Sequence, residues 1–216
     1  MASPLFVVGA YASLAMLIPF VLYNIRIGDI ALQIAYYFHA DYYLYKVEPI
    51  MVCLGVVTFY CYVVMGSIYD MIQSLHRHNR IPSHVTTDFL LRFERAYTQL
   101  HTLFPSFVIA CALLYTNTIR FDTLRNSFMI LQTLLLLVQP LATLSSHGSL
   151  CKYAFRVTLG WALVYALFPR QSYYWIAEIS HTMNDYLGFN AYHPHITHSA
   201  AYRYDHRYKH ENEWIL

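Results

Sequence analysis

Five long apolar runs, separated by polar segments, dominate the pattern along the chain. The first run, residues 5–23, contains no charged residue and spans roughly 28 Å as a helix, close to the thickness of a bilayer core. The later runs cover residues 49–69, 103–119, 127–144 and 153–168. The pattern therefore predicts an all-α, polytopic integral membrane protein with about five transmembrane helices.

The links between these runs constrain how the helices are arranged. Nine residues or fewer join the third run to the fourth and the fourth to the fifth, so these helices are expected to be antiparallel neighbours. No Lys or Arg precedes the first run, and no small-residue cleavage site follows it. We therefore expect a retained first helix rather than a removed signal peptide. Residues 30–38 are apolar but too short to cross a membrane.

The longest polar link contains an amphipathic stretch, residues 87–104. Its apolar residues recur at helical spacing: Phe89, Phe93, Ala96, Leu100 and Leu103. Its polar face holds Arg92, Glu94, Arg95, Thr98 and Gln99. We expect a helix that either lies on the membrane or runs directly into the third span, with Pro105 marking a kink or a fresh start.

The C-terminal quarter differs from the bundle predicted for residues 1–169. Residues 170–188 form a second amphipathic stretch, and residues 189–216 are polar and rich in Tyr and His. A polar segment without its own apolar core needs a surface on which to lie. We therefore expect residues 170–216 to form an interfacial helix followed by a tail, 189–216, that binds a partner protein.

Composition agrees with a membrane protein and excludes several other classes. Hydrophobic residues make up 57% of the chain and charged residues only 12%, about half the share in a soluble domain. This balance excludes a disordered, fibrous or disulfide-rich secreted chain. A formal net charge of +2, with no basic run, argues against nucleic-acid binding.

Ionisable residues are placed at the ends of the apolar runs rather than in their middles. Proton and ion pathways need such groups at membrane depth, so a channel, pump core or coupled transporter is not expected. Basic residues near the ends of spans can reach lipid headgroups, and structural phospholipids are the expected small-molecule contacts. The headgroup candidates are Arg77, Arg80, Arg120, Arg125, Lys152 and Arg156.

Two weak cofactor hypotheses concern polar side chains in or beside the spans. Gln132, Gln139 and Thr143 share one face of the fourth predicted helix, where hydrogen bonding to other helices is the favoured interpretation and quinone contact the alternative. Haem between helices needs axial His or Met ligands, and His101 with His147 is the best pair available. We expect no cofactor.

Histidine clusters raise a metal hypothesis. Glu178, His181 and Asp185 follow one another at i, i+3 and i+7, but di-iron sites need the Glu-x-x-His pair twice. The tail adds five more histidines: His193, His195, His198, His206 and His210. Their spacing does not reproduce the clusters of membrane hydroxylases and desaturases. A polar surface is favoured over a metal site.

No nucleophile elbow, P-loop or zinc-protease motif occurs in the chain. The sequence therefore predicts a non-catalytic accessory subunit of a large membrane complex that stabilises assembly and contacts lipid. Only three of the 14 basic residues are Lys, which fits a mitochondrial inner-membrane respiratory complex or ATP synthase. The alternatives are a His-dependent, lipid-modifying membrane enzyme and a subunit that contacts haem or quinone.

Overall fold

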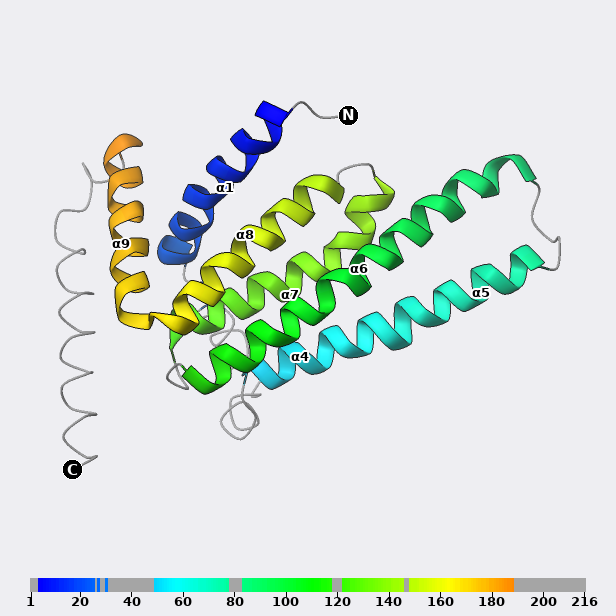
Figure 1. Cartoon of the computed structure of the whole chain (residues 1–216), viewed down its shortest axis with the longest axis horizontal. Coiled ribbons are helices and arrows are strands. Elements are labelled where there is room, and N and C mark those ends of the chain that lie inside the picture. The colour runs from blue at the N-terminus through cyan, green and yellow to red at the C-terminus, as the bar shows by residue number, and fades with distance from the viewer. Residues whose placement is uncertain are drawn as a thin grey trace.

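The computed structural model describes residues 4–25, 27, 30, 49–77, 83–117, 122–145 and 148–188. Within these ranges the fold is helical and contains no strand. Helix α1 is Pro4–Ile25, and α4 (Pro49–Phe59), the π-helical turn η1 (Tyr60–Val64) and α5 (Met65–Arg77) follow one another without a break. The remaining helices are α6 (Ser83–Asn117), α7 (Thr123–Leu144), α8 (Gly148–Leu167) and α9 (Pro169–Tyr186), and Figure 1 shows their arrangement.

Four helical segments are long and apolar enough to cross a membrane: Leu5–Ile25, Pro49–Leu75, Phe89–Asn117 and Thr123–Leu144. They contain the first, second and fourth predicted runs and residues 103–117 of the third, which agrees with an integral membrane protein. The predicted count of about five is not confirmed. The fifth run does form a helix, α8, but Lys152 and Arg156 lower its apolar character and it is not among the four.

The amphipathic stretch at residues 87–104 does not form a separate helix on a membrane surface. It continues into the third apolar run as one helix, α6, and Pro105 lies inside that helix rather than at a fresh start. A strict three- and four-residue spacing runs along the buried side of α6: Phe93, Ala96, Leu100, Leu103, Phe107, Ala110 and Leu114. This heptad seam lets α6 pack along neighbouring helices over much of its length.

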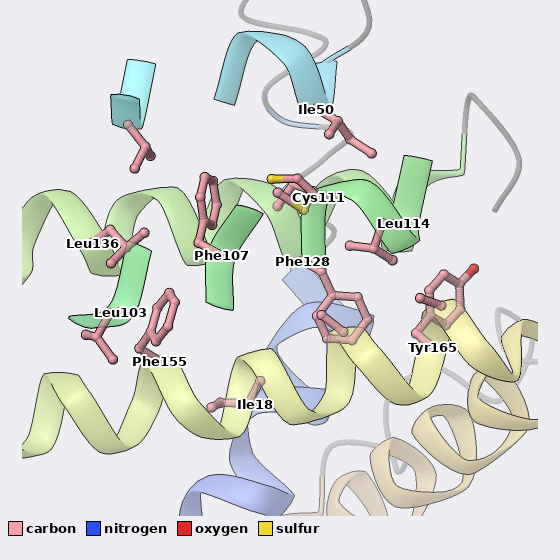
Figure 2. Close-up of a cluster of buried hydrophobic side chains, with 14 of the residues drawn as sticks. Ile18, Ile50, Leu103, Phe107, Cys111, Leu114, Phe128, Leu136, Phe155 and Tyr165 are labelled. Atoms are coloured by element: carbon pink, nitrogen blue, oxygen red, sulfur yellow. The ribbon is translucent and has the colours of Figure 1, made fainter. Parts of the chain in front are cut away.

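Helices α6, α7 and α8 form the centre of the bundle. Each of the three packs against the other two, as expected for antiparallel neighbours joined by short links. The close-up in Figure 2 shows Phe107 and Cys111 from α6, Phe128 from α7 and Phe155 from α8 within one apolar cluster. Helix α4 packs on the α7 side of this centre and α1 on the α8 side.

Helix α9 turns back sharply after α8. Phe168 precedes Pro169, whose fixed φ suits the first turn of a helix and whose ring cannot continue the previous one. Figure 1 shows α9, in orange, lying beside α1 rather than in the central group. A helix does form over most of the stretch 170–188, and its interfacial position stays a prediction; residues 189–216 lie outside the described ranges.

Candidate functional site

Gln139 is the centre of a buried hydrogen-bond network between three helices. Its side chain is fully buried in α7, and its Nε2 shares its two N–H donors among three acceptors: Gln99 Oε1 on α6 (2.9 Å), Thr143 Oγ1 (3.2 Å) and the Gly148 carbonyl at the start of α8 (3.4 Å). The Thr143 hydroxyl lies 3.3 Å from the same Gln99 oxygen. The network therefore joins α6, α7 and α8 near the turn between α7 and α8.

Gly148 fits this network because it has no side chain. A Cβ at this position would lie 2.8 Å from Thr143 Cα, a separation that real Cβ atoms essentially never show. The close approach brings the start of α8 against the last turn of α7. It also explains how the Gly148 carbonyl comes within reach of Gln139.

Gln132 makes a second, weaker link two turns earlier on α7. It is fully buried, and its Nε2 lies 3.4 Å from the Thr158 carbonyl on α8. The Oε1 atoms of Gln132 and Gln139 have no hydrogen-bond partner among the described residues. Both atoms are acceptors, and so are the carbonyl oxygens of a quinone. Their Nε2 donors contact neighbouring helices, as the hydrogen-bonding interpretation expects, and quinone contact stays a prediction.

The turn of α7 before Pro140 also receives donors from neighbouring helices. Proline has no N–H and opens the helical hydrogen-bond ladder one turn earlier. In that turn the Tyr60 hydroxyl donates to the Leu137 carbonyl (3.2 Å), and Cys151 Sγ lies 3.3 Å from the Leu135 carbonyl. Tyr60 begins the π-helical turn η1, so this local irregularity places a donor against the interrupted part of α7.

A charged cluster, which the apolar pattern of the chain does not reveal, lies at the other end of α7. Asp122 caps the helix, because its Oδ1 accepts from Leu124 N (2.9 Å), and its Oδ2 accepts from the Tyr165 hydroxyl on α8. Arg125 lies one turn away and is 1% exposed. Burial raises the pKa of the Asp122 carboxyl, while the Tyr165 hydroxyl, two backbone N–H groups and the Arg125 charge oppose the rise.

This cluster changes the interpretation of Arg125. The expectation that its side chain reaches lipid headgroups is wrong, because the structure places it inside the bundle, where almost no surface is left for a lipid. An Asp a few residues before an apolar run is the signal that can reveal such a helix cap, because Asp is a favoured N-cap residue. The predicted span begins at residue 127, five residues after Asp122, and so it leaves the cap outside the helix.

The other headgroup candidates fall into two groups. Lys152 and Arg156 lie on α8, where Arg156 is exposed and its Nη1 donates to the Tyr11 hydroxyl on α1 (3.3 Å). The Arg77 side chain and all of Arg80 and Arg120 lie outside the described part of the chain. Headgroup contact by Lys152 and Arg156 remains a prediction.

His101, the first of the two haem candidates, lies among aromatic rings on α6. Its ring meets Tyr97 and Tyr62 edge to face, with centroid distances of 4.4 Å and 5.3 Å. Tyr97 in turn stacks on Tyr69 of α5, with centroids 4.6 Å apart. His147, the proposed second ligand, lies outside the described residues, so the haem pair stays a prediction.

The metal candidates on α9 do not gather into a site. Among the described residues, no group of three His, Cys, Asp or Glu side chains is placed to hold one ion. His181 packs against Tyr23 of α1, with ring centroids 5.9 Å apart, while Glu178 and Asp185 are exposed. The tail histidines His193, His195, His198, His206 and His210 lie outside the described ranges.

Helices α1 and α9 are joined by a smaller polar contact. Asn24 Nδ2 donates to Ser180 Oγ (2.7 Å), and Asn184 Nδ2 donates to Asn24 Oδ1 (3.2 Å). Ser172, Ile176 and Ser180 form the buried side of α9 at four-residue spacing. The outer side of the same helix carries aromatic and acidic side chains: Tyr174, Trp175, Glu178, Asp185 and Tyr186.

The hydrogen bonds of these described polar groups thus run between helices. Amides, hydroxyls and one buried charged cluster connect α6, α7 and α8, and α1 is connected to α8 and α9. Compared with known proteins, the chain matches no family model, no curated protein and no solved structure.

Proposed function

We propose that this protein is a non-catalytic structural subunit of a membrane protein complex. One observation carries the proposal: the outer face of α9 combines large aromatic side chains with acidic ones. Tyr174 is 68% exposed, Trp175 43% and Tyr186 89%, and Glu178 and Asp185 lie among them. We call these five residues the α9 outer face.

The chemistry of this face favours a protein partner over lipid or water. Tyr and Trp are enriched in protein interfaces, where they bury apolar area and still offer a hydrogen bond. Helices that lie on membranes carry Lys and Arg on their polar face, because headgroups are often anionic. Glu178 and Asp185 have the opposite charge, and the described part of α9 has one exposed basic residue, Arg170 in its first turn. A protein that supplies apolar contacts and basic groups fits the α9 outer face best.

The interior of the bundle supports a structural role. The buried polar side chains on α7 are mostly amides and hydroxyls, and the charged cluster of Asp122 and Arg125 lies at the start of that helix rather than midway along it. Interhelical hydrogen bonds of this kind stabilise a bundle in lipid by about 0.6 kcal/mol each. The tail, residues 189–216, is proposed as a second contact with the partner.

We also propose which kind of membrane complex contains the protein. The small number of Lys among the basic residues fits an accessory subunit of the mitochondrial inner membrane, in a respiratory complex or ATP synthase. Fractionation of cell membranes tests this location directly. Recovery of the chain with mitochondrial inner membranes is the expected result, and recovery in another membrane would overturn the location but not the structural role.

The experiment that tests the structural role is extraction of native membranes in mild detergent, followed by a native gel and mass spectrometry. The expected result is that the chain migrates in a large complex with fixed stoichiometry. Tyr174→Ala should release part of it, whereas Tyr115→Ala, a similarly exposed tyrosine on α6, should not. Migration of the wild-type chain alone, with a 25.3 kDa subunit mass, would contradict the proposal.

A further inference from the structure

A shallow, open groove lies along one side of α6. It is lined by Leu91, Glu94, Arg95, Thr98, Gln99 and Thr102. The lining therefore contains an acidic and a basic side chain next to each other, with an amide and two hydroxyls one and two turns further along. None of these residues belongs to the α9 outer face.

The orientation of Gln99 directs a donor toward the groove. Its Oε1 accepts hydrogen bonds from Gln139 Nε2 and Thr143 Oγ1, both on the inner side of α6. The amide nitrogen lies on the opposite side of the same planar group, so its two N–H donors are turned away from the network. Gln99 thus joins the buried network to the groove that it lines.

From its place along α6, we expect the groove to lie where the bundle leaves the membrane core. Gln99 is bonded to Thr143, the residue before Leu144 at the end of α7, so both lie near the turn between α7 and α8. Arg95 and Glu94 are one turn further toward the start of α6, about 6 Å beyond Gln99 along the helix. Figure 1 shows α6 continuing past this turn. The charged end of the groove therefore falls at headgroup level.

An apolar path continues from the polar end of the groove into the membrane core. Arg95, Thr98, Thr102, Pro105 and Ile109 follow one another at alternating three- and four-residue spacing and are all exposed. The upper part of this stripe is charged or hydroxylated, and the lower part is apolar. That order matches a phospholipid, whose headgroup lies above its acyl chains.

We propose that the α6 groove binds a zwitterionic phospholipid of the phosphatidylethanolamine type. Arg95 and the Gln99 amide bind the phosphate, since a guanidinium and an N–H donor are matched to its oxygens. Glu94 binds the headgroup ammonium, and Pro105 and Ile109 contact an acyl chain. A lone anionic headgroup would meet the Glu94 charge unfavourably. The site is independent of the subunit role, because a single purified chain can bind lipid.

The test is native mass spectrometry of the full-length chain in detergent after addition of dioleoyl phosphatidylethanolamine or dioleoyl phosphatidylglycerol. The wild-type chain should retain phosphatidylethanolamine about five-fold better than phosphatidylglycerol, which corresponds to roughly one favourable charge contact. Glu94→Gln should abolish this preference. Arg95→Gln should weaken retention of both lipids about five-fold, and Arg95→Lys should restore most of it. Arg92→Gln, an exposed arginine outside the groove lining, serves as the matched control.

Three results would overturn the proposal. Equal retention of both lipids by the wild-type chain would remove the role of Glu94. A loss in Arg92→Gln as large as that in Arg95→Gln would point to general surface charge. Equal binding of glycerophosphoethanolamine, which has no acyl chains, would identify a headgroup-sized solute rather than a membrane lipid as the occupant.

Discussion

Two regions of the molecule contain buried polar side chains but differ in how deeply their hydrogen bonds lie. One is the core formed by α6, α7 and α8, and the other is the pair of helices α1 and α9. In the core, two fully buried side chains, Gln139 and Tyr165, donate hydrogen bonds to partly buried acceptors, Gln99 and Asp122. In the pair, Asn24 makes the corresponding contacts with Ser180 and Asn184 from an exposed position. In the apolar stretch of α1 that is long enough to cross a membrane, 17% of the residues are buried, against 44% in that of α7.

The difference shows where this fold obtains its stability. Lipid tails are as apolar as Leu side chains, so apolar surface alone does not drive helices together in a membrane. Polar groups and close approach at small residues provide the specific attraction. Both are concentrated in the core, around Gln139 and Gly148. The α1–α9 pair has fewer such contacts, and the partner that we propose would bind the outer side of α9.

The largest expected effect comes from filling the close approach at the turn between α7 and α8. Gly148→Ala places a Cβ 2.8 Å from Thr143 Cα, and the helices must move apart. We expect a loss of about 2–3 kcal/mol in unfolding free energy, measured by thermal or denaturant unfolding in detergent. Gly160→Ala on the same helix is the control, because an added Cβ there meets no atom within 4 Å. Equal losses in both variants would show that the turn is not tightly packed.

Removing the Tyr165 hydroxyl should have the next largest effect, and one that depends on pH. Tyr165→Phe removes a hydrogen bond to the Asp122 carboxyl, which costs about 1.5–3 kcal/mol when that carboxyl is ionised. Protonation of Asp122 weakens that bond, so the cost of the mutation should shrink as pH falls through the raised pKa. Unfolding curves of both proteins, measured from acid to alkaline pH, test this. A cost that does not change with pH would contradict the contact with a carboxylate.

Asp122 itself should make the core more sensitive to pH than the α1–α9 pair. Burial raises the pKa of this carboxyl in the folded state above its ordinary value. The group therefore contributes full stability below its ordinary pKa of about 3.9, and that contribution is lost as pH rises through the folded-state pKa. Asp122→Asn keeps a capping side chain and should flatten this part of the stability profile. A wild-type profile that rises with pH relative to the variant would reverse the predicted sign.

Breaking the amide network around Gln139 should lower the unfolding free energy less than Gly148→Ala or Tyr165→Phe does. Gln139→Leu removes bonds to Gln99, Thr143 and the Gly148 carbonyl, at a cost of about 1–2 kcal/mol in a membrane. Gln171→Leu at an exposed position of α9 is the matched control. The comparison of unfolding free energies tests whether the network stabilises the core. Identical values for the two variants would assign it no stabilising role.

The smallest effect on overall stability is expected in the α1–α9 pair. Asn24→Ala removes the contacts with Ser180 and Asn184, and the exposed setting limits the cost to about 0.6 kcal/mol. Hydrogen exchange should nevertheless speed up in α9 while α7 stays protected, because the contact is local. Faster exchange throughout α6, α7 and α8 would mean that the pair and the core are one cooperative unit.

Much of the helical pattern follows from sequence because apolar runs and the heptad spacing of α6 depend only on residue order. Residues such as Leu100 and Leu103 can be assigned to a buried face from their spacing alone, and both are buried. The burial of Arg125 cannot be predicted in this way. It depends on Asp122 and on Tyr165, which is 43 positions from Asp122 in the chain and comes close only after α8 folds back.

The amide contacts are partly predictable for a similar reason. The shared face of Gln132 and Gln139 follows from helical spacing, and hydrogen bonding to other helices is the interpretation that this spacing favours. The spacing of α6 assigns Gln99 to a polar outer face. It cannot show that the Gln99 amide pairs with Gln139 on α7. Likewise, the role of Gly148 depends on the distance to Thr143 and not on its neighbours in sequence.

The most direct test of the account is photo-crosslinking from the α9 outer face in native membranes. A photo-reactive amino acid in place of Tyr174 should form adducts with one protein, reproducibly and in fixed proportion. The same group in place of Tyr115 on α6, which faces outward from the bundle, should give mainly lipid adducts. If position 174 also yields only lipid adducts, α9 lies against the membrane and the proposed structural subunit role is wrong.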